Sequence, residues 1–165
     1  PMKTPAWLTA ASAALVGALL PACDNVNLQE LRPGVSTVAE VRARMGNPSF
    51  EHANPDGSTT WEYNRQPNGI ECHMLTFDPS GVLLRIEQVL TADFQARVRP
   101  GMTREEVRRL LGKPGKTEVY GNLREEIWDW RVAGLMSTEE AHFHVHFNLD
   151  DGLVKTTSRR IESHN

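Results

Sequence analysis

Two short segments of the chain, residues 37–48 and 103–114, carry the same narrow apolar stripe. In each, the apolar side chains recur three or four positions apart, the spacing of one face of a helix. The members are Val41 and Met45 in the first segment and Val107, Leu110 and Leu111 in the second. Helices of about three turns are marginal alone, so each must pack on another part of the chain.

Both ends of each predicted helix are specified by residue type. A threonine stands three positions before a glutamate, the pattern of a capping box that satisfies free backbone N–H groups at the helix start. A glycine and then a proline end each helix, and we expect the glycine to adopt a left-handed conformation. These residues are Thr37, Glu40, Gly46 and Pro48 in the first copy and Thr103, Glu106, Gly112 and Pro114 in the second.

Runs of β-forming residues follow each helix, and their alternation predicts antiparallel strands. They span residues 59–63, 72–77 and 82–89 in the first half and about 126–132, 140–148 and 153–161 in the second. Turn sequences rich in Asp, Asn, Pro and Gly separate them. The matched order of elements predicts two α+β units.

The two helix segments align without a gap, which indicates a duplicated small domain. Arg-Pro-Gly precedes each segment, and an aromatic pair in strand alternation follows it, Trp61 with Tyr63 and Trp128 with Trp130. We expect a first domain at residues 31–90 and a second at 91–165. Each alone would have a thin core, so we expect the two to pack together.

Residues 1–22 have the features of an export signal, with Lys3 before an uncharged stretch rich in Ala and Leu. The sequence Leu20-Pro21-Ala22-Cys23 resembles the lipobox of bacterial lipoproteins. That resemblance implies cleavage before Cys23, acylation of this cysteine, and a lipidated tether at residues 23–30. The alternative is ordinary export with an unmodified cysteine.

The only other cysteine is Cys72, so the sequence provides no disulfide framework. Asp24, directly after the predicted lipid site, resembles an inner-membrane retention signal. It leaves both membranes open, although we favour the outer one. The composition is 39% hydrophobic and 24% charged, with a net charge of −3, which does not favour a nucleic-acid partner.

The stretch Ala141 to Phe147 contains the most prominent candidate chemistry. Alternation in a strand places its three histidines, His142, His144 and His146, on one face. Imidazoles spaced about 6.5–7 Å along a strand can offer two ligands to a zinc or copper ion, with a third from a neighbouring strand. The favoured interpretation is nevertheless the exposed face of an amphipathic strand, and no metal or other cofactor is expected.

No motif predicts an enzyme. The sequence has no Gly-x-Ser-x-Gly elbow, no His-Glu-x-x-His helix and no phosphate-binding glycine loop. Cys72 and His73 are adjacent, so on a strand they face opposite ways and do not form a nucleophile–base pair. Trp61, Tyr63, Trp128 and Trp130 are either core residues or a protein-binding surface, and we keep them as candidates for partner contact.

The sequence Arg-Pro-Gly-Met-Thr-x-x-Glu-Val-x-x-x-Leu-Gly-x-Pro, followed by Trp-x-Trp, resembles the SmpA/OmlA family of BamE-like lipoproteins. The same superfamily includes the domain found twice in β-lactamase inhibitor proteins. The resemblance implies two short helices packed on a three-stranded antiparallel sheet, here in tandem. The first copy is looser, with one extra residue before Thr37 and Tyr63 in place of a second tryptophan.

The resemblance implies a non-enzymatic, periplasm-facing lipoprotein that binds a protein partner in the cell envelope. The barrel-assembly machinery is the candidate partner, and the function would be outer-membrane protein assembly or envelope integrity. Two alternatives remain: a protein inhibitor like the β-lactamase inhibitor proteins, and a metal-binding envelope protein that uses the histidine strand.

Overall fold

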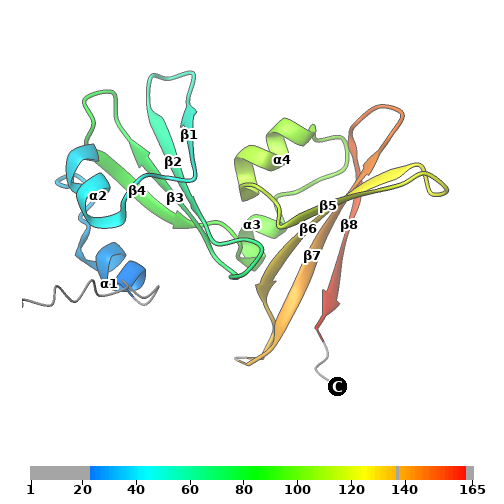
Figure 1. Ribbon diagram of the computed structural model, residues 1–165. Helices are drawn as coiled ribbons and strands as arrows, with labels where there is room; N and C mark the ends of the chain where they lie inside the picture. The colour runs from blue at the N-terminus through cyan, green and yellow to red at the C-terminus, as the bar shows by residue number, and fades with distance from the viewer. Residues whose placement is uncertain (1–22, 137, 163–165) are drawn as a thin grey trace, which may run out of the picture.

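The computed structural model describes residues 23–136 and 138–162, which form two halves with matched elements (Figure 1). The first half contains α1 (Cys23–Glu30), α2 (Val38–Met45), β1 (Phe50–Ala53), β2 (Thr59–Asn64), β3 (Cys72–Phe77) and β4 (Leu83–Gln88). The second contains α3 (Ala92–Gln95), α4 (Arg104–Leu111), β5 (Lys116–Tyr120), β6 (Glu125–Ala133), β7 (Glu140–Asn148) and β8 (Val154–Ile161). Each half is α+β, as predicted. The predicted export signal lies outside the described residues.

Each sheet has four antiparallel strands, so the expectation of three was wrong. The strand orders are β1-β2-β3-β4 and β5-β6-β7-β8. The additional strand, β1 or β5, follows the proline that ends the helix and pairs with the next strand along the chain. These edge strands are short, and all five residues of β5 are exposed. They therefore lack the alternating apolar pattern by which strands are recognised.

The helix ends follow the sequence in most respects. The Thr37 and Thr103 hydroxyls accept hydrogen bonds from the backbone N–H groups three residues on, at 3.3 Å and 3.1 Å. Gly46 and Gly112 have the expected positive φ, 76° and 80°. Their ψ values of −167° and −178° are extended, however, rather than those of a left-handed helix. This conformation is essentially restricted to glycine.

Helix α4 packs against both sheets, and this joins the halves. Figure 1 shows α4 between the two sheets, with α1 and α2 on the far side of the first sheet. The second core contains Val107 and Leu111 from α4, and it also includes Cys72 and Met74 from β3 of the first half. The first core is separate and lies between the first sheet and its own helices.

Polar contacts reinforce this junction. The Gln66 side-chain amide bonds twice to the backbone of Arg131, donating to its carbonyl at 2.6 Å and accepting from its N–H at 2.9 Å. The Arg109 guanidinium donates to the carbonyl of Ala53 at 3.2 Å. The two halves are thus joined by hydrogen bonds from side chains to the backbone as well as by apolar packing.

The segment predicted as a tether, residues 23–30, is helix α1 in the structure. Leu28 packs against the first core, and the Asn27 amide donates to the carbonyl of Arg44 at 2.9 Å. The chain is therefore held against the domain from this point, which shortens any flexible tether. None of the helices in the described ranges is long and apolar enough to span a membrane.

Candidate functional site

Equivalent faces of the two sheets carry an acidic residue at the same position of the repeat. Glu62 stands between Trp61 and Tyr63 on β2, and Asp129 stands between Trp128 and Trp130 on β6. Alternation turns each acid away from its aromatic neighbours. We call the side of the first sheet that bears Glu62 the inner face, and the side of the second sheet that bears Asp129 the outer face.

The inner face is covered by α4, and Glu62 is fully buried there. One carboxylate oxygen contacts the Arg108 guanidinium at 2.5 Å and His52 Nε2 at 3.0 Å. The other oxygen accepts from the Asn64 amide and from the backbone N–H of Lys113, both at 3.0 Å. Glu62 thus binds the end of α4 through both a side chain and the backbone.

The charge of Glu62 is stabilised by these partners. Burial by itself raises the pKa of the carboxyl, but the hydrogen bonds from Asn64, Lys113 and Arg108 lower it further than burial raises it. The net result is a pKa below the ordinary value. Glu62 is therefore ionised at neutral pH and acts as an electrostatic contact between the halves.

The outer face has no helix or strand over it among the described residues (Figure 1). Here Asp129 is bonded by histidines of the adjacent strand β7. His142 Nδ1 lies 2.8 Å from one carboxylate oxygen, and His144 Nε2 lies 2.7 Å from the other. The three side chains are only 15–19% exposed. Two imidazoles thus converge on one carboxylate in a shallow, half-buried position.

His146, the third residue of the predicted histidine set, has different partners. Its Nδ1 lies 3.0 Å from Glu125, and its Nε2 lies 2.7 Å from the Ser158 hydroxyl. Glu125 also accepts from Lys155 at 2.8 Å, and the hydrogen bonds from Lys155 and His146 lower the pKa of Glu125. Both ring nitrogens of His146 are engaged, so it does not join His142 and His144.

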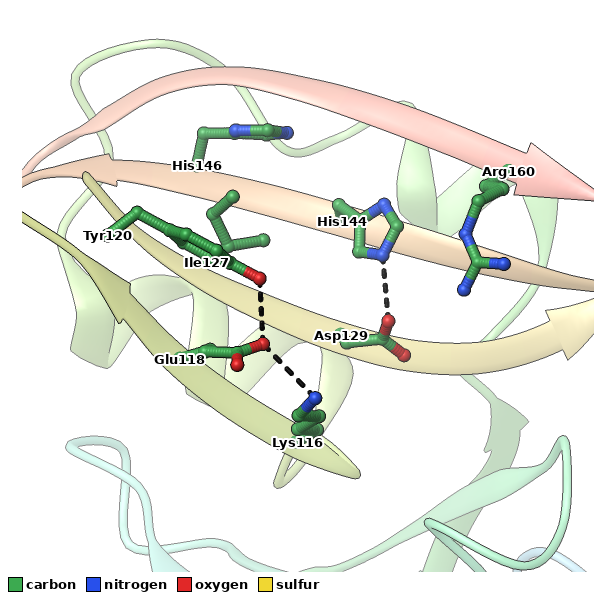
Figure 2. Close-up of a pocket in the computed structure, with 8 residues that line it drawn as sticks. All are labelled: Lys116, Glu118, Tyr120, Ile127, Asp129, His144, His146 and Arg160. Carbon is green, nitrogen blue, oxygen red and sulfur yellow. Dashed lines mark hydrogen bonds and ion pairs between the residues drawn. The ribbon is translucent and has the colours of Figure 1, made fainter. Parts of the chain in front are cut away.

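A hollow of about 270 Å³ lies on the outer face next to this cluster (Figure 2). Asp129 and His144 form part of its wall, and the edge strand β5 forms another part. On β5, Glu118 pairs with Lys116 at 3.1 Å and accepts from the Tyr120 hydroxyl at 2.7 Å. The bonds from Tyr120 and Lys116 lower the pKa of Glu118.

The four aromatic candidates for partner contact lie on the helix-covered faces of their sheets. Trp61 and Trp130 are buried, 4% and 0% exposed, and belong to the two cores. Tyr63 and Trp128 are half-buried and pack against the same cores. The structure therefore places the two buried tryptophans where a partner cannot reach them, and it does not present either pair as an open aromatic surface.

Cys72 is buried and has no reactive setting. Burial raises the pKa of its thiol well above the ordinary value, so the thiolate is not formed at neutral pH. Its Sγ packs against the backbone at Gly112. A Cβ atom added at that glycine would lie 2.7 Å from the sulfur. Cys72 is thus a packing residue of the junction. The side chain of Cys23, the predicted lipid site, is not among those described.

Large apolar side chains are exposed at both ends of the second half, at Leu135 and Met136 at one end and at the turns after β5 and β7 at the other. The turn between β5 and β6 lies beside the turn between β7 and β8, where the Leu149 N–H donates to the Arg124 carbonyl at 3.0 Å. We call this region the apolar tip. Its members are Val119, Tyr120, Leu123 and Leu149, with exposures of 60%, 37%, 56% and 38%.

Two residues that organise these faces, Glu62 and Asp129, were not identified from the sequence. A signal for both was present, since an acid between two core aromatics must face away from the core. For Asp129 this places the carboxylate on the same sheet face as the histidines of β7. The strand register then decides which imidazoles meet it.

Comparisons with known proteins match the second half to a family. Residues 87–157 match the family model described as the outer membrane protein assembly factor BamE domain. None of the curated proteins compared matches the chain.

Solved structures give only distant likenesses. A candidate beta-lactamase inhibitor protein from Streptococcus mutans is 10% identical, with 84% of this chain and 98% of that chain covered and a TM-score of 0.31. A DUF4309 family protein from Bacillus subtilis is 16% identical, with coverage of 81% and 84% and a TM-score of 0.31. An extracellular protein with an SCP domain from Bacillus anthracis is 10% identical, with coverage of 99% and 50% and a TM-score of 0.30. At these scores the likenesses carry no argument, and the comparison that remains is the similarity of residues 87–157 to the BamE domain model.

Proposed function

We propose that this protein is a non-enzymatic lipoprotein that faces the periplasm and binds a protein partner in outer-membrane protein assembly or envelope integrity. The observation that carries the proposal is the match of residues 87–157 to the BamE domain model. The duplicated fold fits a binding role. Its most strongly specified residues begin, end and connect helices and strands, and they do not form a catalytic motif. The candidate partner is a component of the barrel-assembly machinery.

The apolar tip is the surface that we assign to the partner. Val119 and Tyr120 face opposite sides of β5, so the tip offers exposed apolar side chains on both sides of this hairpin, and such exposed side chains are typical of protein contacts. The two turns that form the tip are held together by the Leu149 backbone bond and by an ion pair between Arg124 and Asp150. A pre-formed surface of this kind loses little conformational entropy when a partner binds.

The anchor is acylated Cys23, favoured for the outer membrane, with the inner membrane open because of Asp24. Labelling of cells with a palmitate analogue tests this. The label is expected on the wild-type protein and absent from Cys23→Ala, while Cys72→Ala keeps it. A wild-type protein that takes up no label and is found free outside the membrane fraction would contradict the anchored scaffold.

Site-specific photo-crosslinking in cells tests the partner. A photoreactive amino acid at Leu123, in the apolar tip, is expected to capture a component of the barrel-assembly machinery. Leu84 is the matched control, because it is 45% exposed but lies on β4 of the first half. Equal capture from both positions, or no envelope protein captured from Leu123, would contradict the assigned surface.

The same experiment separates the scaffold from the inhibitor hypothesis. An inhibitor of this superfamily would need exposed aromatic residues on its sheets, and Trp61 and Trp130 are buried. Capture of soluble enzymes alone, with no assembly component, would favour the inhibitor class.

A further inference from the structure

We propose that Asp129, His142 and His144 form a binding site for a divalent transition-metal ion, with zinc as the best-suited ion. The site lies on the outer face of the second sheet, and it stands independently of the scaffold function. It differs from the set predicted from the histidine strand, because Asp129 of β6 replaces His146.

The distances between the three ligating groups suit a single ion. One ligand atom from each residue lies within 4.8 Å of the others. Ligands about 2.0–2.1 Å from a tetrahedral zinc ion are about 3.3 Å apart. The His142–Asp129 and His144–Asp129 contacts of 2.8 Å and 2.7 Å involve the two different carboxylate oxygens, so each imidazole has to move by about half an ångström or more, and the carboxylate has to reorient, to place one ion between them.

The ligand types select the class of ion. Two imidazole nitrogens and one carboxylate oxygen favour zinc, copper or nickel over calcium and magnesium, which prefer oxygen ligands. Three protein ligands leave a fourth position for water or another group.

A second carboxylate lies behind one of the ligands. His142 directs Nδ1 at Asp129, and its Nε2 lies 3.8 Å from Glu162 Oε2. This oxygen is buried and accepts no hydrogen bond from the described residues, although Arg131 lies 3.5 Å away. Metal-bound histidines commonly donate their second ring N–H to such a carboxylate, which fixes the tautomer. An approach of roughly 1 Å would let Glu162 accept this N–H and orient His142.

The inner face shows why the site belongs to one half only. There Cys72 and Met74 of β3 occupy the positions that His142 and His144 occupy on β7. The oxygens of Glu62 are already taken by donors from α4 and from the first half. Among the described residues, the Asp129 carboxylate is bonded only by His142 and His144 of its own sheet, so this carboxylate and these imidazoles can exchange their mutual bonds for a metal ion.

Two cationic side chains share the hollow beside the cluster. Lys116 is neutralised by its pair with Glu118, at 3.1 Å. Arg160 lines the same hollow (Figure 2). Its positive charge opposes a cation, so replacement of Arg160 by glutamine is expected to tighten binding.

Cobalt and zinc titrations of the full-length chain, purified in detergent without a polyhistidine tag, test the site. Bound Co²⁺ is expected to give visible absorption bands that Zn²⁺ abolishes. Zinc at about one hundred times its dissociation constant should raise the melting temperature by roughly 5 °C. Absence of both effects in the wild-type protein would overturn the proposal.

Three variants locate the ligands. Asp129→Asn and His144→Gln are expected to abolish the cobalt bands and the thermal shift, while the matched control His146→Gln keeps both. Circular dichroism without metal verifies that each variant is folded. Equal loss in His146→Gln and His144→Gln would overturn the assignment.

A further variant tests the orienting carboxylate. Glu162→Gln should weaken zinc binding by about tenfold while retaining the cobalt bands. Unchanged affinity in this variant would remove Glu162 from the site.

Discussion

The inner face of the first sheet and the outer face of the second occupy the same position in a repeated domain, yet they satisfy a central acid in different ways. On the inner face, Glu62 is bonded by Arg108 and by the Lys113 N–H of the next domain. On the outer face, Asp129 is bonded by His142 and His144 of its own sheet. The carboxylate of the inner face therefore depends on donors from the second half, whereas the carboxylate of the outer face is bonded within its own sheet.

This difference follows from the place of each face in the stack. In a chain of stacked repeats, an inner surface is covered by the next repeat, whereas the terminal surface must be polar. Cys72 and Met74 on the inner face give way to histidines on the outer one. The two copies thus differ at these positions in the way expected when one face is covered and the other is not.

Removal of each acid gives the largest expected contrast. Glu62→Ala leaves Arg108 without its partner in the junction and should lower the free energy of unfolding by about 3–5 kcal/mol. Asp129→Ala, without metal, should cost roughly 1 kcal/mol, because its histidine partners are partly exposed and can bond to water. Urea denaturation of both variants measures the difference. Equal losses would contradict the distinction between the two faces.

The glycines that end the two helices provide the next contrast. Alanine at either position is strained by the positive φ, at a cost of about 1–3 kcal/mol. At Gly112 the new Cβ would also lie 2.7 Å from Cys72 Sγ, whereas at Gly46 nothing lies within 4 Å. Gly112→Ala should therefore be less stable than Gly46→Ala by about another 1–3 kcal/mol in urea. Cys72→Ala in the Gly112→Ala background should recover part of this difference.

The helix N-caps should be equivalent, because capping is local to each copy. Thr37→Ala and Thr103→Ala should each cost about 1 kcal/mol in thermal or urea unfolding. A much larger loss for Thr103→Ala would show that the start of α4 also contributes to the junction between the halves.

The smallest effect is the dependence of stability on pH below about 4.5. Glu62 has a folded-state pKa below its ordinary value of 4.5. Its contribution is therefore fully present above pH 4.5 and is lost as the pH falls through the lower, folded-state pKa. Unfolding free energies from pH 7 down to pH 3 should decline less in Glu62→Gln than in the wild-type protein. Parallel curves would contradict the assigned ionisation.

Local patterns predicted the elements that carry a strong internal signal. The stripe of Val107, Leu110 and Leu111 and the cap at Thr103 identified α4 correctly. The edge strands β1 and β5 were missed because they are held by pairing with their neighbours and not by an apolar pattern of their own. The positive φ of Gly112 was predicted, but its extended ψ was not.

The sequence predicted the histidines of the candidate site but not their acidic partners. Alternation placed three histidines of β7 on one face, and the structure confirms that arrangement. It could not show that His142 and His144 meet Asp129 while His146 meets Glu125, because the partners come from another strand. That choice depends on the register between β6 and β7, which aligns Asp129 with His144.

The sequence by itself determined the duplication, the capped helices and the faces of the principal strands, because caps and alternation act between residues close in the chain. Only the tertiary structure decided that α4 packs against both sheets and that α4 covers Glu62. It also decided that no helix covers Asp129 among the described residues and that two imidazoles contact its carboxylate. These features depend on contacts between residues distant in the chain, whose geometry is set only when the two halves pack together.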